Sequence, residues 1–342
     1  MIMSKKRLTY IDACKAIGIL LVLLGHTHNL PRPLYLAIYA FHMPLFFILS
    51  GFVHRKNESI GFFRYALDKA KHLLIPYFLF AFINLAIEFL WKTVYVKEAL
   101  PANYLFIKLK GILLCYSNTE NMPNCSPIWF LVCLFIASLV FWWLIKLQFR
   151  FSAPIVLALG AANYLLLPLC RDHTSFPFKF PTFLLAACFL YIGYYLKLLF
   201  EKPPKFLTHP LWPALGAVIV FGTCSCWVIL TDNLVGMNEN AYSNYLVFSI
   251  TSVLMSVAFI CLMKTTVRKT SPFWNFLGKN TLYIMGFNYV FRDIATELYY
   301  FTPYLRNHPI HWTVCFALTT AIALLFLLIL IRFKRFFVKK ST

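Results

Sequence analysis

Three ionisable residues share one apolar segment near the start of the chain. Asp12, Lys15 and His26 occur in the run YIDACKAIGILLVLLGHTH, residues 10–28. Successive residues of an α-helix turn by about 100°, so Lys15 and His26 differ by only about 20° in heading, and Asp12 shares their face. Ionisable groups inside a membrane span cost a few kcal/mol and usually mark a functional site. The spacing therefore predicts a polar stripe along one helix.

The stripe has two interpretations. Lys15 and His26 are separated by roughly 16 Å along the helix axis, so they cannot touch, but the stripe could line a passage across most of the bilayer. Alternatively, Asp12 and Lys15 form an i,i+3 ion pair near the membrane interface, and His26 caps the helix at the opposite headgroups. The spacing alone favours neither interpretation.

A second histidine, His42, lies in the next apolar segment, two residues before Pro44. Proline inside a helix frees a backbone carbonyl and kinks the helix, and His42 could be a packed residue that bonds to that carbonyl. Imidazole titrates near neutrality, however, so two histidines on adjacent spans also suit acid–base catalysis. His26 and His42 are therefore candidate catalytic residues, with Asp12 as a third that would orient or neutralise Lys15.

The composition shows what kind of protein holds these residues. Of the 342 residues, 61% are hydrophobic, 18% are aromatic and 13% are charged. Soluble domains are about 45–50% apolar and about 25% charged. The composition excludes a soluble enzyme, a disordered chain and a coiled coil, and the long apolar blocks exclude an outer-membrane barrel. We expect an all-α, polytopic helical membrane protein.

At about 20 apolar residues per span, the chain predicts about ten transmembrane helices. The apolar blocks run over residues 9–29, 34–54, 73–95, 128–147, 152–170, 181–200, 210–230, 242–263, 281–300 and 311–332. Residues 55–72 combine basic and aromatic side chains, which predicts an interfacial amphipathic helix. Residues 96–127 form a long connection on the other side. We find no repeat or soluble domain, so residues 1–342 form a single integral-membrane domain.

The charge distribution predicts the orientation. The chain has 32 Lys and Arg residues against 12 Asp and Glu residues, a net charge of +20. With an even number of spans both termini share one side, and 22 of the 32 basic residues fall there, which favours N-in and C-in in a multi-pass protein of the cell (inner or plasma) membrane. The scattered charge does not indicate a nucleic-acid partner. It does suit a polyanionic cytosolic ligand.

The ten cysteines make no CxxC pair and no Cys/His ligand spacing, so we expect no metal.

Four motifs in order resemble the acyltransferase-3 family, integral-membrane enzymes that O-acylate cell-surface glycans, including fucose-4-O-acetyltransferase-like members. Lys15, ten residues and His26 match the first span of that family. The other matches are FHMPLFFILSGF at 41–52, SPIWFLVCLF at 126–135 and LGKNTLYIMGFN at 277–288. Residues 150–270 are similar only in hydropathy. Relatives often carry histidine at the position of Asn288, so a role for a third histidine is not expected.

The resemblance implies acetyl-CoA as the acyl donor and a glycan or glycolipid as the acceptor. Candidate partners for the phosphates of the donor are Arg55, Lys56 and Arg64 on the basic face, with Lys15 deeper in the membrane. Arginine can bind phosphate through two hydrogen bonds and lysine acts as a point charge. Arg55 and Lys56 can equally be basic residues that anchor a cytoplasmic loop.

Acyl transfer to a hydroxyl requires removal of a proton and stabilisation of an oxyanion. His26 could act as general base, or it could accept the acyl group as a nucleophile in a two-step transfer. His42 could stabilise the oxyanion or position the acceptor. The alternative to an acyltransferase is a multi-span transporter or flippase for a glycolipid or small solute, which ten spans fit equally well. Against transport, the two halves show no repeat and no paired broken spans.

Overall fold

The fold is described from a computed structural model. The described residues are 8–54, 60–116, 121–123, 126–170, 176–201, 211–267, 269, 271–302, 305 and 308–340, with side chains to Phe333 in the last helix. They form helices and one β-hairpin with strands of two residues each, in which β1 (Val235–Gly236) pairs antiparallel with β2 (Ala241–Tyr242).

Thirteen α-helices occur among these residues. They are α1 (Thr9–Gly25), α2 (Arg32–Tyr39), α3 (His42–Phe52), α4 (Phe62–Leu90), α5 (Tyr104–Leu114), α6 (Trp129–Leu144), α7 (Phe149–Leu165), α8 (Thr182–Glu201), α9 (Leu211–Leu230), α10 (Tyr245–Thr266), α11 (Pro272–Gly286), α12 (Asn288–Phe301) and α13 (Trp312–Lys340). A π-helical turn, Trp91–Val96, continues α4, and short 3-10 turns cover Ser126–Ile128, Leu167–Cys170 and Pro177–Lys179.

Six helical segments of the described chain are long and apolar enough to cross a membrane. They are Arg32–Phe52, Phe62–Val96, Pro177–Glu201, Leu211–Leu230, Tyr245–Thr266 and Trp312–Phe333. The shorter helices α6 and α7 are also apolar. An apolar chain that folds into helices bonds its backbone groups internally, as a bilayer interior requires. The prediction of an all-α, multi-pass membrane protein is therefore confirmed.

Two connections differ from the sequence prediction. Residues 62–72 do not form a separate interfacial helix, because they are the first turns of α4, which runs unbroken to Leu90. Residues 55–59 lie outside the described residues. The connection 96–127 contains a helix of its own, α5, whose eleven residues are too few to suggest a span.

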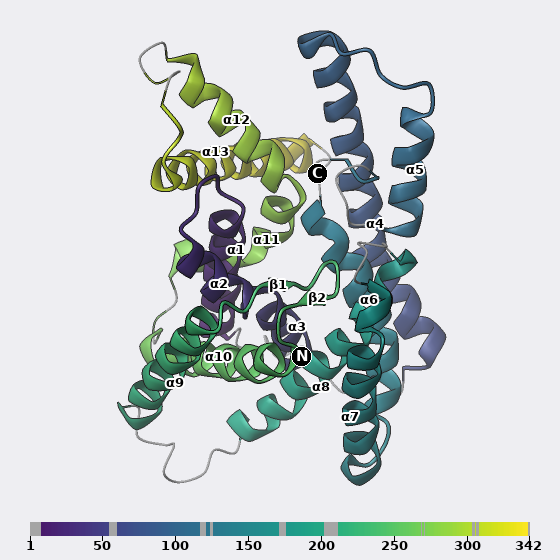
Figure 1. Ribbon diagram of the computed structural model, residues 1–342, viewed down its shortest axis with the longest axis vertical. Helices are drawn as coiled ribbons and strands as arrows, with labels where there is room; N and C mark the ends of the chain where they lie inside the picture. The colour runs from purple at the N-terminus through teal and green to yellow at the C-terminus, as the bar shows by residue number, and fades with distance from the viewer. Residues whose placement is uncertain are drawn as a thin grey trace.

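Close helix contacts hold the first three helices in the middle of the molecule. Figure 1 shows α1 beside α11, α9 beside α10, and α4 and α5 together along one side. Gly51 of α3 and Gly193 of α8 face each other's helix, and a Cβ on Gly51 would lie 2.7 Å from the carbonyl carbon of Leu190. On α11, a Cβ on Gly278 would lie 2.5 Å from the carbonyl oxygen of Asp12. Small residues thus let backbones approach where α1 and α3 pack, as is common in membrane helices.

Candidate active site

His42 stands at the start of α3, immediately after a break in the helix. Phe41, with φ −140° and ψ −20°, separates α2 from α3. Pro44 falls in the first turn of α3. Backbone N–H groups in this turn have no intrahelical partner, so the missing N–H of proline costs no hydrogen bond there. The buried His42 ring donates from Nδ1 to the carbonyl oxygen of Ile38 at 2.8 Å. A carbonyl can only accept, so this bond places the proton on Nδ1 and leaves Nε2 as an acceptor.

His26 is the first residue after α1, and its backbone N–H bonds to Leu23 O at 3.3 Å. The hydroxyl of Tyr39 lies 3.4 Å from His26 Nδ1 and 3.3 Å from the carbonyl oxygen of Gly25. The Tyr39 ring contacts both histidines, with centroids 6.2 Å from His26 and 4.9 Å from His42. Tyr289 of α12 packs against His26 at 5.1 Å. Two histidines and two tyrosines therefore form one cluster, from four helices or helix ends.

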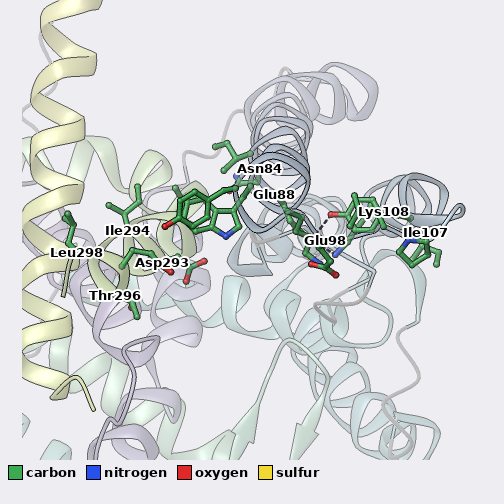
Figure 2. A pocket seen from close by; sticks show the side chains of 18 of the residues that line it. Asn84, Glu88, Glu98, Ile107, Lys108, Asp293, Ile294, Thr296 and Leu298 are labelled. Carbon is green, nitrogen blue, oxygen red and sulfur yellow. Dashed lines mark hydrogen bonds and ion pairs between the residues drawn. The ribbon is translucent and has the colours of Figure 1, made fainter. Parts of the chain in front are cut away.

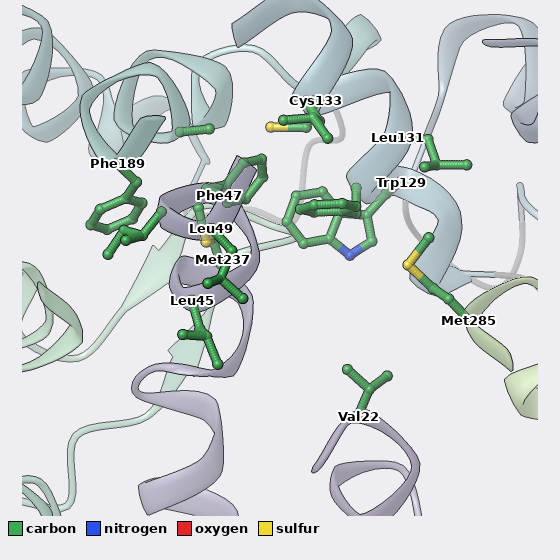
Figure 3. Close-up of a cluster of buried hydrophobic side chains, with 14 of the residues drawn as sticks. Val22, Leu45, Phe47, Leu49, Trp129, Leu131, Cys133, Phe189, Met237 and Met285 are labelled. Atoms are coloured by element: carbon green, nitrogen blue, oxygen red, sulfur yellow. The ribbon is translucent and has the colours of Figure 1, made fainter. Parts of the chain in front are cut away.

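The cluster borders a cavity of about 370 Å³, called here the histidine cavity. Its lining residues are Val22, His26, Tyr35, Tyr39, His42, Met43, Phe46, Pro127, Trp129, Val235–Glu239, Met285 and Tyr289. Figure 3 shows Val22, Trp129, Met237 and Met285, which supply part of its apolar wall. A small, mostly apolar cavity with a few convergent polar groups is the usual form of a ligand or active site.

The β-hairpin covers part of this cavity and is held in place by side-chain contacts. The buried Lys179 donates to Asn238 Oδ1 at 2.9 Å, and its ammonium lies 5.8 Å from the centre of the Trp129 ring. At the base of the hairpin, Arg32 Nε donates to Asp232 Oδ1 at 2.6 Å. The hydrogen bonds from Arg32, together with its charge, lower the pKa of the Asp232 carboxyl. These contacts hold residues 235–239 over the histidines.

Arg292 and Asp293 carry charge on the side of the cluster formed by α12. The guanidinium of Arg292 donates to Asp293 Oδ1 at 2.7 Å and lies 4.6 Å from the Tyr289 ring centre. In the loop after α1, burial and the charge of Arg292 lower the pKa of His28. A fixed positive charge thus stands close to the histidine cavity.

The structure brings together two of the three predicted catalytic residues. His26 and His42 line one cavity, and Val22, four residues or about one helical turn before His26, lines it with them. Asp12 is buried against α11, fourteen residues or roughly 21 Å along α1 from His26, and it is not in the cavity lining. Its catalytic role stays a prediction.

The predicted donor-binding residues lie away from the histidine cavity. Lys15 is half-buried in α1, and Arg64 is exposed in the first turn of α4. Arg55 and Lys56 lie outside the described residues. None of these four residues is in the lining of the histidine cavity as the structure describes it.

Two lysines, Lys69 and Lys197, form a basic cluster beside His54, just after the C-terminal end of α3. Lys197 of α8 donates to the carbonyl oxygen of His54 at 3.1 Å. Burial, with the charges of Lys69 and Lys197, lowers the pKa of His54 to about 4. His54 is therefore neutral at physiological pH, beside two ammonium groups. This cluster and His42 stand at the two ends of one eleven-residue helix, roughly 16 Å long.

Sequence reasoning missed Tyr39, Tyr289 and the hairpin residue Glu239. Tyr39 precedes His42 by three residues, a spacing that would place the two rings on one face of a continuous helix. Tyr289 and Glu239 reach the cavity through long-range packing. No local pattern marks either residue.

The fold and the site together define a multi-pass membrane protein with a paired-histidine cavity. A family model described as an acyltransferase domain, that of the acyltransferase-3 family, matches residues 8–328. The chain therefore belongs to the acyltransferase-3 family, and membrane acyltransferase activity follows as its class of function. The searches of curated proteins and of solved structures returned no match.

Proposed function

We propose that the protein is an O-acetyltransferase that moves an acetyl group from acetyl-CoA to a hydroxyl of a cell-surface polysaccharide or of its lipid-linked precursor. The observation that carries the proposal is the His26–Tyr39–His42 cluster in a small cavity of an acyltransferase-3 protein. Membership of this family favours an acyltransferase over the transporter or flippase alternative. A fucose-4-O-acetyltransferase-like acceptor is a narrower form of the same proposal.

In the proposed reaction, the acceptor oxygen attacks the thioester carbonyl while His26 removes the hydroxyl proton. The tetrahedral oxyanion then collapses, the carbon–sulfur bond breaks, and the CoA sulfur leaves and receives the proton from His26. The Tyr39 hydroxyl is close enough to orient the His26 ring through Nδ1. The polarity of His42 Nε2 suits contact with the acceptor hydroxyl. In the alternative route, His26 takes the acetyl group first and passes it to the acceptor.

The donor would approach from the basic end of α3. A CoA nucleotide is polyanionic, and Lys69 and Lys197 beside His54 supply positive charge there. Lys15 and Arg64, with Arg55 and Lys56, complete the proposed donor site. This route agrees with the proposed orientation, in which about ten spans place both termini and this basic end in the cytoplasm of a cell-membrane protein.

The test is turnover of labelled acetyl-CoA by membranes that contain the wild type, His26→Ala or the control variant His72→Ala at matched expression. His72 is exposed on α4, outside the histidine cavity. We expect turnover by the wild type and His72→Ala, and a loss of at least about 10²-fold in His26→Ala. Equal turnover by His26→Ala would remove His26 as the catalyst. Absence of turnover by every form, with acceptor extracts supplied, would refute the donor assignment.

A further inference from the structure

A second and larger cavity lies on the other side of α12. It encloses about 1010 Å³ between α4, the π-helical turn, α5 and α12, and is called here the acidic cavity (Figure 2). Apolar side chains such as Ile87, Ile107 and Ile294 form much of its wall. Several of these residues, including Leu298 and Phe301, are exposed on the outside of the molecule. The cavity therefore adjoins an exposed apolar surface.

The cavity is acidic in a strongly basic protein. Its lining includes four of the 12 Asp and Glu residues of the chain: Glu88, Glu98, Asp293 and Glu297. Among the described lining residues, Lys92 and Lys108 are the lysines. Lys108 pairs with Glu88 at 3.0 Å, with both side chains buried, and Lys92 lies 3.7 Å from Glu98. Asp293 is paired by Arg292, which lies outside the lining.

Glu297 is the fourth acidic residue of the lining and does not take part in these three ion pairs. It is exposed on α12 and makes no ion pair with any residue that the structure describes. The local charge therefore repels an anion and attracts hydroxyl or ammonium donors, because an ionised carboxylate can only accept hydrogen bonds. A polyanionic CoA nucleotide does not fit this cavity.

Aromatic rings stand at the same cavity. Trp91 and Tyr95, one turn apart in the π-helical segment, stack with their centroids 4.2 Å apart. They are 42% and 66% exposed, so the outer faces of the pair are not covered by the protein. The face of an aromatic ring can pack against the apolar face of a sugar ring or attract a cation.

Two buried asparagines, one in the lining of the acidic cavity and one at the start of α12, have hydrogen-bonding atoms without a partner in the described chain. Asn84, which lines the acidic cavity, donates from Nδ2 to Gly286 O at 2.9 Å, while its Oδ1 bonds to no described group. Asn288, at the first residue of α12, is 1% exposed, and neither polar atom of its side chain has a partner in the described chain. Such atoms cost free energy unless they bind something, which indicates a polar ligand.

The first turn of α12 is the wall between the two cavities. Tyr289 lines the histidine cavity, and its neighbour Val290 lines the acidic cavity. A ligand in the acidic cavity is therefore separated from His26 by one helical turn that begins at a break, Phe287.

We propose that the acidic cavity binds the head of the acceptor, a hydroxylated ring that is neutral or carries an ammonium group, and that it excludes anionic rings and the acyl donor. The identification of this ligand as the acceptor rests on the proposed function. The charge selectivity comes from Glu297 and its neighbours, and the ring packs on Trp91 and Tyr95. Free sugars and lipid-linked sugars share this chemistry, and the adjoining apolar surface suits the lipid-linked form.

The test is photolabelling of the wild type in lipid nanodiscs with octyl glycosides that carry a diazirine on the chain. The heads are glucose, glucosamine and glucuronate, and a methyl glucoside with a diazirine tests the free sugar. We expect glucose and glucosamine probes to label peptides of residues 87–108 and 290–301 at least about tenfold more than the glucuronate probe, because like charges in a binding site repel. Stronger labelling by octyl than by methyl glucoside assigns the lipid-linked source.

Glu297→Lys is the decisive variant, because it should create a signal rather than lose one. We expect it to raise labelling by glucuronate and lower labelling by glucosamine, whereas Glu201→Lys, at the end of α8 and outside the cavity, should change neither. Equal labelling by all three heads, labelling confined to other helices, or unchanged selectivity in Glu297→Lys would overturn the proposal.

Acetyl-CoA turnover in the same nanodiscs separates the two proposals. Turnover without labelling in the acidic cavity refutes this inference and leaves the proposed function. Charge-selective labelling in a protein that never turns over acetyl-CoA supports the binding site and refutes the proposed reaction.

Discussion

Replacing Gly51 by alanine should disrupt catalysis without touching the histidine cavity. Gly51 lies where α3 crosses α8, and a Cβ there would stand 2.7 Å from the carbonyl carbon of Leu190 and would overlap the carbonyl oxygen. Ordinary contacts between carbon atoms begin at about 3.5 Å. The new Cβ is fixed to the backbone of α3, and the atoms that it meets belong to the backbone of α8 at Leu190, so no side-chain rotation can relieve the clash. The two helices must separate by roughly 1 Å.

The displacement reaches the site because α3 begins with His42. The rigid eleven-residue helix carries any shift at Gly51 to that ring and to its bond with Ile38. A misplacement of about 1 Å can cost about 10²-fold in rate, and overpacking costs about 1–3 kcal/mol in stability. We therefore expect acetyl transfer by Gly51→Ala to fall by about 10²-fold, with a lower Tm.

Gly222→Ala in α9 is the matched control. A Cβ on Gly222 meets no atom within 4 Å, so alanine should leave turnover unchanged and favour the helix by about 0.5–1 kcal/mol. The assay is acetyl-CoA turnover with Tm measured on the same purified samples. Wild-type turnover and Tm in Gly51→Ala would show that the α3–α8 contact is not as close as the structure has it.

Three further outcomes follow from the same contacts. Tyr39→Phe removes the hydroxyl near His26 Nδ1, so we expect turnover to fall about tenfold with little change in Tm, and an unchanged rate would contradict the orienting role. His42→Asn keeps a donor toward Ile38 O but has no Nε2, so loss of transfer at normal Tm would separate chemistry from packing, whereas full activity would leave His42 a packing residue. Glu88→Leu leaves the buried Lys108 without this ion-pair partner and should lower the free energy of unfolding by about 3–5 kcal/mol, measured by thermal unfolding. Adding Lys108→Met should recover most of that stability, and a double variant no more stable than the single variant would refute this account.

Hydropathy predicted the helical segments but not where they break. The expected kink at Pro44 is instead a helix boundary three residues earlier, at Phe41, because proline is best accommodated in the first turn of a new helix. The block 281–300 is likewise divided at Phe287, into α11 and α12. Neither break interrupts the apolar run, so a reading of hydrophobicity passes over both. These are the breaks that place His42 and Tyr289 at helix starts.

The spacing of Lys15 and His26 identified one face of α1, and Val22 and His26 on that face line the histidine cavity. The partners of His26 could not be predicted in the same way. Tyr289 is 263 residues from His26 in the sequence, and Glu239 arrives on a hairpin held by Lys179. Such contacts depend on how helices pack, which one sequence does not specify locally.

In the proposed reaction, the charges of the molecule keep two substrates of different character apart. The basic groups beside His54 would attract a polyanionic donor to one end of α3, and the carboxylates of the acidic cavity would repel it from the far side of α12. A site that accepted both substrates by one route would let the donor occupy the acceptor's place. Under the two proposals, separate approaches of opposite charge would prevent that competition and would bring thioester and hydroxyl toward the histidines from different sides. On this argument the net charge of +20 matters less to the proposed function than the position of four acidic residues.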